Sequence, residues 1–240
     1  MKQIILNFLP LLICGTSLGQ ININTIYNNV NNAINASSLS NADITNGLKE
    51  ALNVGSKNAG DKAGKVDGFY KNPLIKIPYP SQTRGMMNTL KNLGMESQVK
   101  AFEKQLNRAA EDAAIKAAPI FLNAVKNMNI NDGLVILKGK NDAATQYLKQ
   151  NTSNELNNQF KPVIASSLQK VDITKYWKPL FNRYNKLPFV KRVNPDLEAY
   201  VTQKAMEGLF TLVAQEELKI RKDPSARISA ILQKVFGAKQ

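Results

Sequence analysis

The segment AQEELKIRKDPSARI, residues 214–228, concentrates charged side chains as an acid/base catalytic site would. These side chains are Glu216, Glu217, Arg221, Asp223 and Arg227. Glu217 precedes Arg221 by four residues and Asp223 precedes Arg227 by four, which is the spacing of ion pairs on one helix face. Asp223 is followed by Pro224, a combination that typically starts a helix. We therefore predict a corner between two helices, braced by two ion pairs, rather than a catalytic centre.

A second group of charges lies in LNRAAEDAA, where Arg108 and Asp112 are four residues apart and predict another ion pair. Glu111 and Asp112 lie in an alanine-rich helix that we expect to be central, where a buried charge needs a partner. Asp142 is the remaining carboxylate of interest. We interpret this network as structural; a carboxylate pair that cleaves a glycosidic bond stays an alternative.

Aromatic and basic residues interleave in YWKPLFNRYNKLPFVKR, residues 176–192, and no acid occurs between Asp172 and Asp196. On a helical wheel the aromatic residues share one face and the lysines lie opposite. One interpretation is a buried stripe with a solvated back; the other is a helix that lays its aromatic residues among lipid headgroups. The candidate residues for an anionic partner are Lys175, Trp177, Lys178, Arg183, Lys186, Lys191 and Arg192.

The residue types that are absent limit the chemistry. The sequence has no histidine, and Cys14 is the only cysteine. Ser-His-Asp triads, histidine-bearing metal centres and zinc-thiolate sites are therefore excluded. We expect no metal, no cofactor and no catalytic residue. The sequence favours a non-enzymatic protein without ruling out a histidine-free hydrolase.

Residues 1–19 resemble a secretory signal peptide, because a short apolar run follows Lys2 and small residues precede Gln20. We predict cleavage between Gly19 and Gln20, export to the periplasm or cell envelope, and no transmembrane segment in the mature chain. A lipid-modified Cys14 is disfavoured by the bulky Ile13 before it. Residues 20–38 are rich in Asn and predict a flexible arm.

Residues 39–237 show the periodicity of helices, and no stretch alternates as a strand does. Ser40 and Asp43 form a capping box for the first helix. Apolar residues recur at three- and four-residue steps from Val99 to Val125, with a kink expected at Pro119. The fold class is all-α, a compact single-domain bundle of several helices, some of them kinked.

Three further helix boundaries are predicted. Thr152 and Glu155 match a capping box before a helix that Pro162 should bend or divide. Asn194 and Pro195 should open the next helix. The last helix should begin at Asp223-Pro224 and bury one apolar face. The residues of this face are Ile228, Ile231, Leu232 and Val235.

Several long segments resemble a bacterial family of exported, all-helical proteins known only as a domain of unknown function. The segments are LSNADITNGLKEAL, LNRAAEDAA, ILKGKNDAATQYL, NPDLEAYVTQKAMEGLF and EELKIRKDPSARISAILQKVFG. They occur in order over about residues 39 to 237. The resemblance implies a single domain in the envelope or outside the cell, and it implies no activity, cofactor or catalytic residue.

The net charge of +14 would draw the protein toward anionic surfaces. Scattered lysines that maintain solubility would give the same charge. We predict an exported envelope protein with a basic surface for an anionic partner: a lipid headgroup, an acidic glycan or a protein. Export disfavours a nucleic-acid partner. The alternatives are a carboxylate hydrolase and a helical bundle that holds an apolar ligand.

Overall fold

The computed structural model describes residues 39–170, 173–190 and 196–237, with only the backbone for 173–177. These residues form helices and short turns without a strand, which confirms the all-α prediction. The helices are α2 (Asn41–Gly64), η1 (Ser81–Thr83), α3 (Arg84–Asn92), α4 (Glu96–Ala114), α5 (Ala117–Lys126), α6 (Ile130–Lys138), α7 (Ala143–Lys170), α8 (Ile173–Asn185), α9 (Leu197–Lys222), η2 (Pro224–Ala226) and α10 (Ala230–Gly237).

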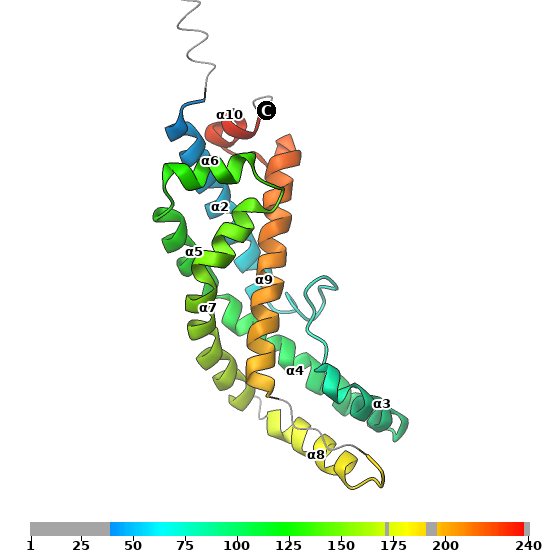
Figure 1. The fold of residues 1–240 in the computed structure, drawn as a ribbon. Coiled ribbons are helices and arrows are strands. Elements are labelled where there is room, and N and C mark those ends of the chain that lie inside the picture. The colour runs from blue at the N-terminus through cyan, green and yellow to red at the C-terminus, as the bar shows by residue number, and fades with distance from the viewer. Residues whose placement is uncertain (1–38, 171–172, 191–195, 238–240) are drawn as a thin grey trace, which may run out of the picture. The chain divides into compact units, whose positions relative to one another are not determined.

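The long helix α9 packs against α7, α2 and α4, and these elements enclose most of the core (Figure 1). Their buried side chains include Leu48, Phe102, Phe160 and Leu209. Helices α6 and α10 pack on α2 at one end of the bundle, which we call the α10 end. Helix α8 packs on α3 and α4 at the opposite end, the α8 end. None of the described helices has the length and apolarity needed to cross a membrane.

Helix α2 begins as the sequence predicts. The Ser40 hydroxyl accepts a hydrogen bond from the Asp43 amide, and the Asp43 carboxylate accepts one from the Ser40 amide. The helix continues to Gly64, beyond Gly60. A Cβ at Gly64 would lie 2.9 Å from Cγ1 of Ile115, so glycine allows close approach of the segment that joins α4 to α5.

The expected kink at Pro119 is a break between α4 and α5. Pro119 has no amide to donate to the carbonyl of Ile115, the residue after the last of α4. The helix therefore ends at Ala114 and restarts at Ala117. This break turns the periodic apolar stripe into two shorter helices that both contact α2 and α7.

Helix α7 corrects one prediction. It runs without interruption from Ala143 to Lys170, with Pro162 inside it. Thr152 is not an N-cap, because its hydroxyl donates to the carbonyl of Leu148, four residues earlier in the same helix. The buried surface that α7 shares with α4 and α9 outweighs the local capping signal.

The two ends of α9 were predicted with different success. Asp196 caps its start by accepting a hydrogen bond from the Ala199 amide, and the predicted openers Asn194 and Pro195 lie outside the described residues. The helix ends at Lys222, as expected. Pro224 then starts a short 3₁₀ turn rather than α10 itself. Ile228 precedes α10 and is 71% exposed, so its predicted burial is wrong.

Leu232 and Val235 of α10 are buried, and Ile231 packs partly against the core, as predicted. A Cβ at Gly47 would lie 2.5 Å from a methyl carbon of Val235, so α10 sits close to the first half of α2. Lys234 of α10 also forms an ion pair with Asp43 of α2 at 2.8 Å. These contacts fix the α10 end of the bundle.

Candidate functional site

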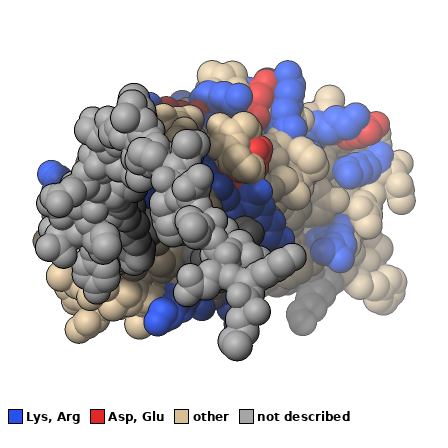
Figure 2. All heavy atoms as spheres, turned by 90° about the horizontal axis from the view of Figure 1, so that it is seen from above, with Lys and Arg blue, Asp and Glu red and all other residues tan. Residues whose placement is uncertain are grey.

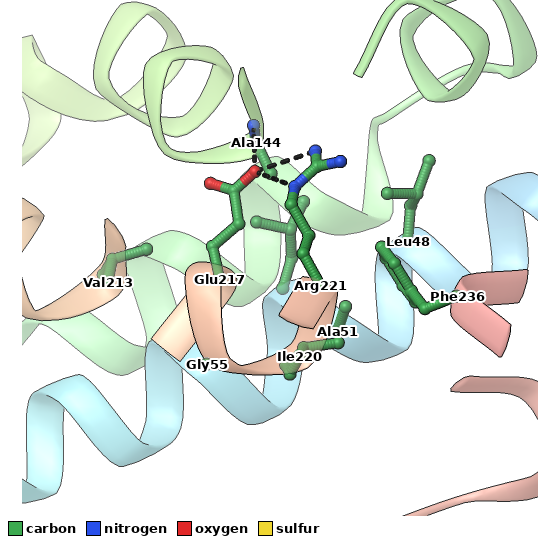
Figure 3. Close-up of a pocket in the computed structure, with 10 residues that line it drawn as sticks. Leu48, Ala51, Gly55, Ala144, Val213, Glu217, Ile220, Arg221 and Phe236 are labelled. Atoms are coloured by element: carbon green, nitrogen blue, oxygen red, sulfur yellow. Dashed lines mark hydrogen bonds and ion pairs between the residues drawn. The ribbon is translucent and has the colours of Figure 1, made fainter. Parts of the chain in front are cut away.

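Glu217 is a buried carboxylate at the α10 end of the bundle (Figure 3). Its Oε1 accepts hydrogen bonds from the Ala144 amide at 3.0 Å and from Arg221 Nε at 2.9 Å. Its Oε2 accepts from the amide and the hydroxyl of Thr145, both at 2.8 Å. Ala144 and Thr145 begin α7, where free amides and the helix dipole favour an anion. Glu217 is therefore a cap of α7 supplied by another helix.

Arg221 caps the end of α6, as Glu217 caps the start of α7. Its Nη2 donates to the carbonyl of Ile136 at 2.9 Å and its Nη1 to that of Leu137 at 3.4 Å. These carbonyls lie in the last turn of α6, where a cation is favoured. The expected Glu217–Arg221 ion pair is present, and it joins the ends of two helices that are consecutive in the chain.

The recess beside this ion pair is too small for a substrate. It has a volume of about 10 Å³ and is lined mostly by apolar side chains from α2, α9 and α10. Figure 3 shows Phe236 and Leu48 on one side and Val213 on the other. Such a volume is close to that of one water molecule. The Glu217–Arg221 pair is thus enclosed and has no room to act on a ligand.

The expected ion pair between Asp223 and Arg227 is wrong, because Arg227 bonds the backbone instead. Its Nε and Nη2 donate at 3.0 Å to the carbonyls of Ile220 and Arg221, in the last turn of α9. Asp223 instead accepts from the hydroxyl and the amide of Ser225, and these two bonds lower the pKa of its carboxyl. Each charge bonds groups at a helix end, where backbone groups have no partner within the helix.

Glu216 joins α9 to α2. Its Oε1 accepts from Lys62, and also from Lys219 at 3.0 Å, and its Oε2 accepts from the side-chain Nδ2 of Asn58 at 3.1 Å. Burial raises the pKa of Glu216, but the hydrogen bonds from Lys62, Lys219 and Asn58 outweigh it, so the net pKa is lowered. Glu216 is therefore held as a carboxylate.

Glu111 of α4 fixes the loop that follows α2. Its Oε1 accepts from the amides of Phe69 and Tyr70, both at 3.1 Å. Its Oε2 accepts from the Asp67 amide at 3.2 Å and from Arg108. Asp67 has φ of +67°, in the left-handed region that aspartate tolerates, so the loop turns where its amides bond the carboxylate. Both oxygens of Glu111 are occupied by this loop.

The expected Arg108–Asp112 pair is wrong. Arg108 pairs with Glu111 and, at 2.5 Å, with Oδ1 of Asp67. Burial lowers the pKa of Arg108, but its bonds to Glu111 and Asp67 outweigh it and the net pKa is raised. Asp112 faces α7 instead, where it accepts from the Ser167 hydroxyl at 2.5 Å.

Asp142 stands at the start of α7. Its side chain accepts from the Gln146 side chain at 3.0 Å, and its carbonyl accepts from the Gln146 amide at 2.9 Å. It therefore belongs to the local structure of the helix start. Over residues 39–170, 173–190 and 196–237, no three His, Cys, Asp or Glu side chains are placed to hold a metal ion.

Asn107 is a structural residue that sequence reasoning missed. Its fully buried side chain exchanges two hydrogen bonds of 2.8 Å with the backbone amide and carbonyl of Ile77. It also donates to the carbonyl of Glu103. Its burial could have been predicted from the sequence, because Asn107 lies three residues before Ala110, on the apolar face of a periodic helix. The partner, thirty residues earlier, has no signal in the sequence.

Helix α8 presents a different arrangement of charge. Leu180 and Tyr184 are buried against the core, whereas Lys178 and Arg183 of the helix, and Lys186 directly after it, are exposed. We call these three cations the basic α8 surface. None of them forms an ion pair within the part of the chain that the structure describes. The side chains of Lys175 and Trp177, and residues Lys191 and Arg192, lie outside that part.

The aromatic residues of the segment divide between two environments. Tyr184 belongs to the core, as the interpretation of a buried stripe expected, and Phe189 beyond the helix end is fully exposed. Figure 2, which views the molecule from the α10 end, shows Lys and Arg spread between uncharged residues with few acids. Basic side chains are therefore not confined to α8, and α8 is one of several helices without an acid, together with α3, α5 and α10.

Residues 38–237 match the family model described as "Protein of unknown function (DUF4197)". No curated protein and no solved structure matches the chain. The matched span is nearly that of the segments that suggested a helical family of unknown function, so this resemblance is confirmed. The match assigns no reaction or ligand.

Proposed function

Because the chain belongs to the DUF4197 family of proteins of unknown function, we propose a function from its geometry: a non-enzymatic, exported envelope protein that binds an anionic partner through the basic α8 surface. The observation that carries the proposal is the exposure of Lys178, Arg183 and Lys186 without ion-pair partners among the described residues. Some exposed lysines elsewhere are neutralised by neighbouring acids, as Lys57 is by Asp61, whereas others, such as Lys138 and Lys140, also have no ion pair among the described residues. The α8 cations differ from Lys138 and Lys140 in lying between aromatic residues, in a stretch without an acid from 173 to 195.

Cations without acidic partners, two on α8 and one directly after it, favour contact with phosphates or carboxylates. Each such residue near an anionic surface contributes about 1 kcal/mol of attraction. The inner face of α8 is held by Leu180 and Tyr184 in the core, so the helix can keep its cations outward without unfolding. This anchoring supports a preformed surface rather than a segment that orders on binding.

The two alternative functions have less support. A hydrolase needs a carboxylate that can reach a substrate, but both oxygens of Glu111, Glu216 and Glu217 accept hydrogen bonds from the protein itself. A carrier of apolar ligands needs a large apolar cavity. The recess lined by Leu48, Val213 and Phe236 has a volume of only about 10 Å³. A larger groove between α7 and α9, of about 580 Å³, is lined mostly by polar residues such as Gln146, Lys149 and Glu207.

The binding proposal is tested by reversing the charge of the α8 surface. Lys178→Glu/Lys186→Glu is compared with Lys138→Glu/Lys140→Glu, which changes the net charge equally at two exposed lysines, one at the end of α6 and one in the connection to α7. Binding to vesicles that contain an anionic phospholipid, and to polyphosphate, is measured from low to high salt. We expect the α8 variant to bind at least tenfold more weakly, and the control to bind nearly as the wild type.

Salt should weaken wild-type binding, because the Debye length falls from about 10 Å at 0.1 M to about 3 Å at 1 M. Equal losses in the two variants would show that the charge acts diffusely and would contradict a site on α8. Wild-type binding by both variants would also contradict the proposal.

The export part of the proposal rests on the apolar run and small residues before Gln20. Intact-mass measurement on protein from the producing cell tests it. We expect a chain that begins at Gln20. A chain that retains Met1, or that carries a lipid on Cys14, would contradict cleavage at this point.

A further inference from the structure

Phe189 is an aromatic residue that the fold does not use. Its side chain is fully exposed, with a relative accessibility of 106%, more than any other exposed large apolar residue in the described part of the chain. Its backbone has φ of +61°, a left-handed conformation that is uncommon for a bulky residue. A strained backbone that holds an apolar side chain in water suggests a function outside the fold.

The neighbours of Phe189 hold it at the surface. Leu187 and Val190, on either side, pack partly against the core. The Leu187 amide donates to the carbonyl of Tyr184 at 2.9 Å, which ties the turn to the end of α8. Phe189 is therefore presented outward by residues that are themselves anchored, and it follows Lys186 of the basic α8 surface by three positions.

We infer that the anionic partner is a phospholipid bilayer and that Phe189 is the apolar anchor that enters it. This inference rests on the proposed function, since it assigns the partner of the same surface. Cations that contact phosphates beside an apolar side chain that enters the acyl region form the combination by which peripheral proteins bind membranes. Lys186 directly follows the last residue of α8, and the seven residues that follow Lys178 up to the helix end span roughly 10 Å, so Lys178 and Lys186 can contact different headgroups.

A soluble polyanion would contact the basic α8 surface but would leave Phe189 without a partner. Polyphosphate offers charge for Lys178, Arg183 and Lys186 but no apolar interior for Phe189. Single-stranded RNA offers charge and also bases on which an aromatic ring can stack. The contribution of Phe189 to each of these probes therefore distinguishes a bilayer from the other anionic partners.

The test measures the full-length chain with three probes: vesicles of phosphatidylcholine mixed with phosphatidylglycerol, polyphosphate, and a single-stranded RNA oligonucleotide. Phe189→Ala should weaken vesicle binding about tenfold, a difference of ~1.4 kcal/mol, and leave polyphosphate binding unchanged. Val135→Ala, at an apolar residue of α6 that is 73% exposed, is the matched control and should bind all probes as the wild type does.

A second variant separates binding from stability. Phe189→Gly removes the same anchor, and glycine adopts positive φ without strain, so its melting temperature should not fall below that of the wild type. It should bind vesicles as weakly as Phe189→Ala. Reduced vesicle binding by a variant with an unchanged fold would support the inference that Phe189 enters the bilayer.

The outcomes also separate this inference from the proposed function. If the Phe189 variants bind vesicles like the wild type while Lys178→Glu/Lys186→Glu does not, the basic surface stands and the bilayer anchor is wrong. If Phe189→Ala weakens RNA binding and leaves vesicle binding unchanged, the partner is a nucleic acid and the inference is overturned. If the charge-reversal variant binds every probe like the wild type, the proposed function fails first.

Discussion

The C-terminal half of α9 and helix α8 both carry several charges, but they use them in opposite ways. In α9, Glu216, Glu217 and Arg221 are directed into the bundle, and each bonds groups on other helices. In α8, Lys178 and Arg183 are directed outward and have no ion-pair partner among the described residues. A density of charge in a sequence therefore does not identify a functional site by itself.

The two helices differ in whether their charged groups already have hydrogen-bond and ion-pair partners within the protein. A buried carboxylate whose oxygens accept from helix amides stabilises the fold and cannot also receive a proton or a substrate. An exposed cation without an acidic neighbour contributes little to stability and keeps its donors for a partner. The comparison predicts that substitutions in α9 change stability and that substitutions in α8 change binding.

The largest effect is expected from Arg221→Met. It leaves Glu217 buried without its cation and removes the donor to the carbonyls of Ile136 and Leu137. Breaking a buried ion pair in this way lowers the free energy of unfolding by about 3 kcal/mol or more. Urea denaturation followed by circular dichroism measures it.

Lys222→Met is the matched control, since Lys222 is the next residue and is exposed. Its free energy of unfolding should stay within about 0.5 kcal/mol of the wild type. Equal destabilisation by both substitutions would show that the Glu217–Arg221 pair is not the structural centre of this end. Arg221→Met should retain vesicle binding at temperatures where it is folded.

A smaller effect, about 2 kcal/mol, is expected from Asn107→Ala. This substitution extends the comparison to α4, because it leaves the buried amide and carbonyl of Ile77 without their partner. Lys104→Ala, at an exposed residue of the same helix, should change stability little. Equal unfolding midpoints for both variants in urea would contradict the role of Asn107 as a clamp.

The sequence predicted those parts of the fold that depend on neighbouring residues. The Ser40–Asp43 capping box, the effect of Pro119, which was expected as a kink and is a break between α4 and α5, and the end of α9 near Lys222 each depend on residues within about four positions. The capping box predicted at Thr152 failed although its pattern is equally local, because packing of α7 on α4 and α9 keeps the helix continuous.

The site depended on contacts over long distances in the chain, and these were mostly missed. Glu217 bonds Thr145, which is 72 residues away, and Glu111 bonds the loop that contains Phe69. Single-sequence periodicity indicates which face of a helix is buried, but not which backbone amides meet it. The exposure and positive φ of Phe189 likewise have no signal in the sequence.

Asp223→Ala tests the structural role of the charges that follow α9, with a smaller expected loss of stability. It removes the acceptor for the Ser225 amide and hydroxyl at the corner between α9 and α10. Loss of such a cap should lower the melting temperature by about 2–4 °C. Asp223→Asn keeps an oxygen acceptor and should melt closer to the wild type. A loss of vesicle binding by folded Asp223→Ala, with unchanged melting, would mean that the corner is a functional site.

The smallest change in stability is expected from Lys178→Glu/Lys186→Glu. Because these side chains are exposed and lie in a stretch without acids, reversing their charge breaks no ion pair among the described residues. It also reduces repulsion with Arg183, so the free energy of unfolding should stay within about 0.5 kcal/mol of the wild type, with any change toward greater stability. Urea denaturation of this variant and of Arg221→Met, under the same conditions, measures the smallest and the largest expected change in the free energy of unfolding. If the α8 variant loses as much stability as Arg221→Met, the α8 cations are part of the architecture, and the contrast between the two helices is wrong.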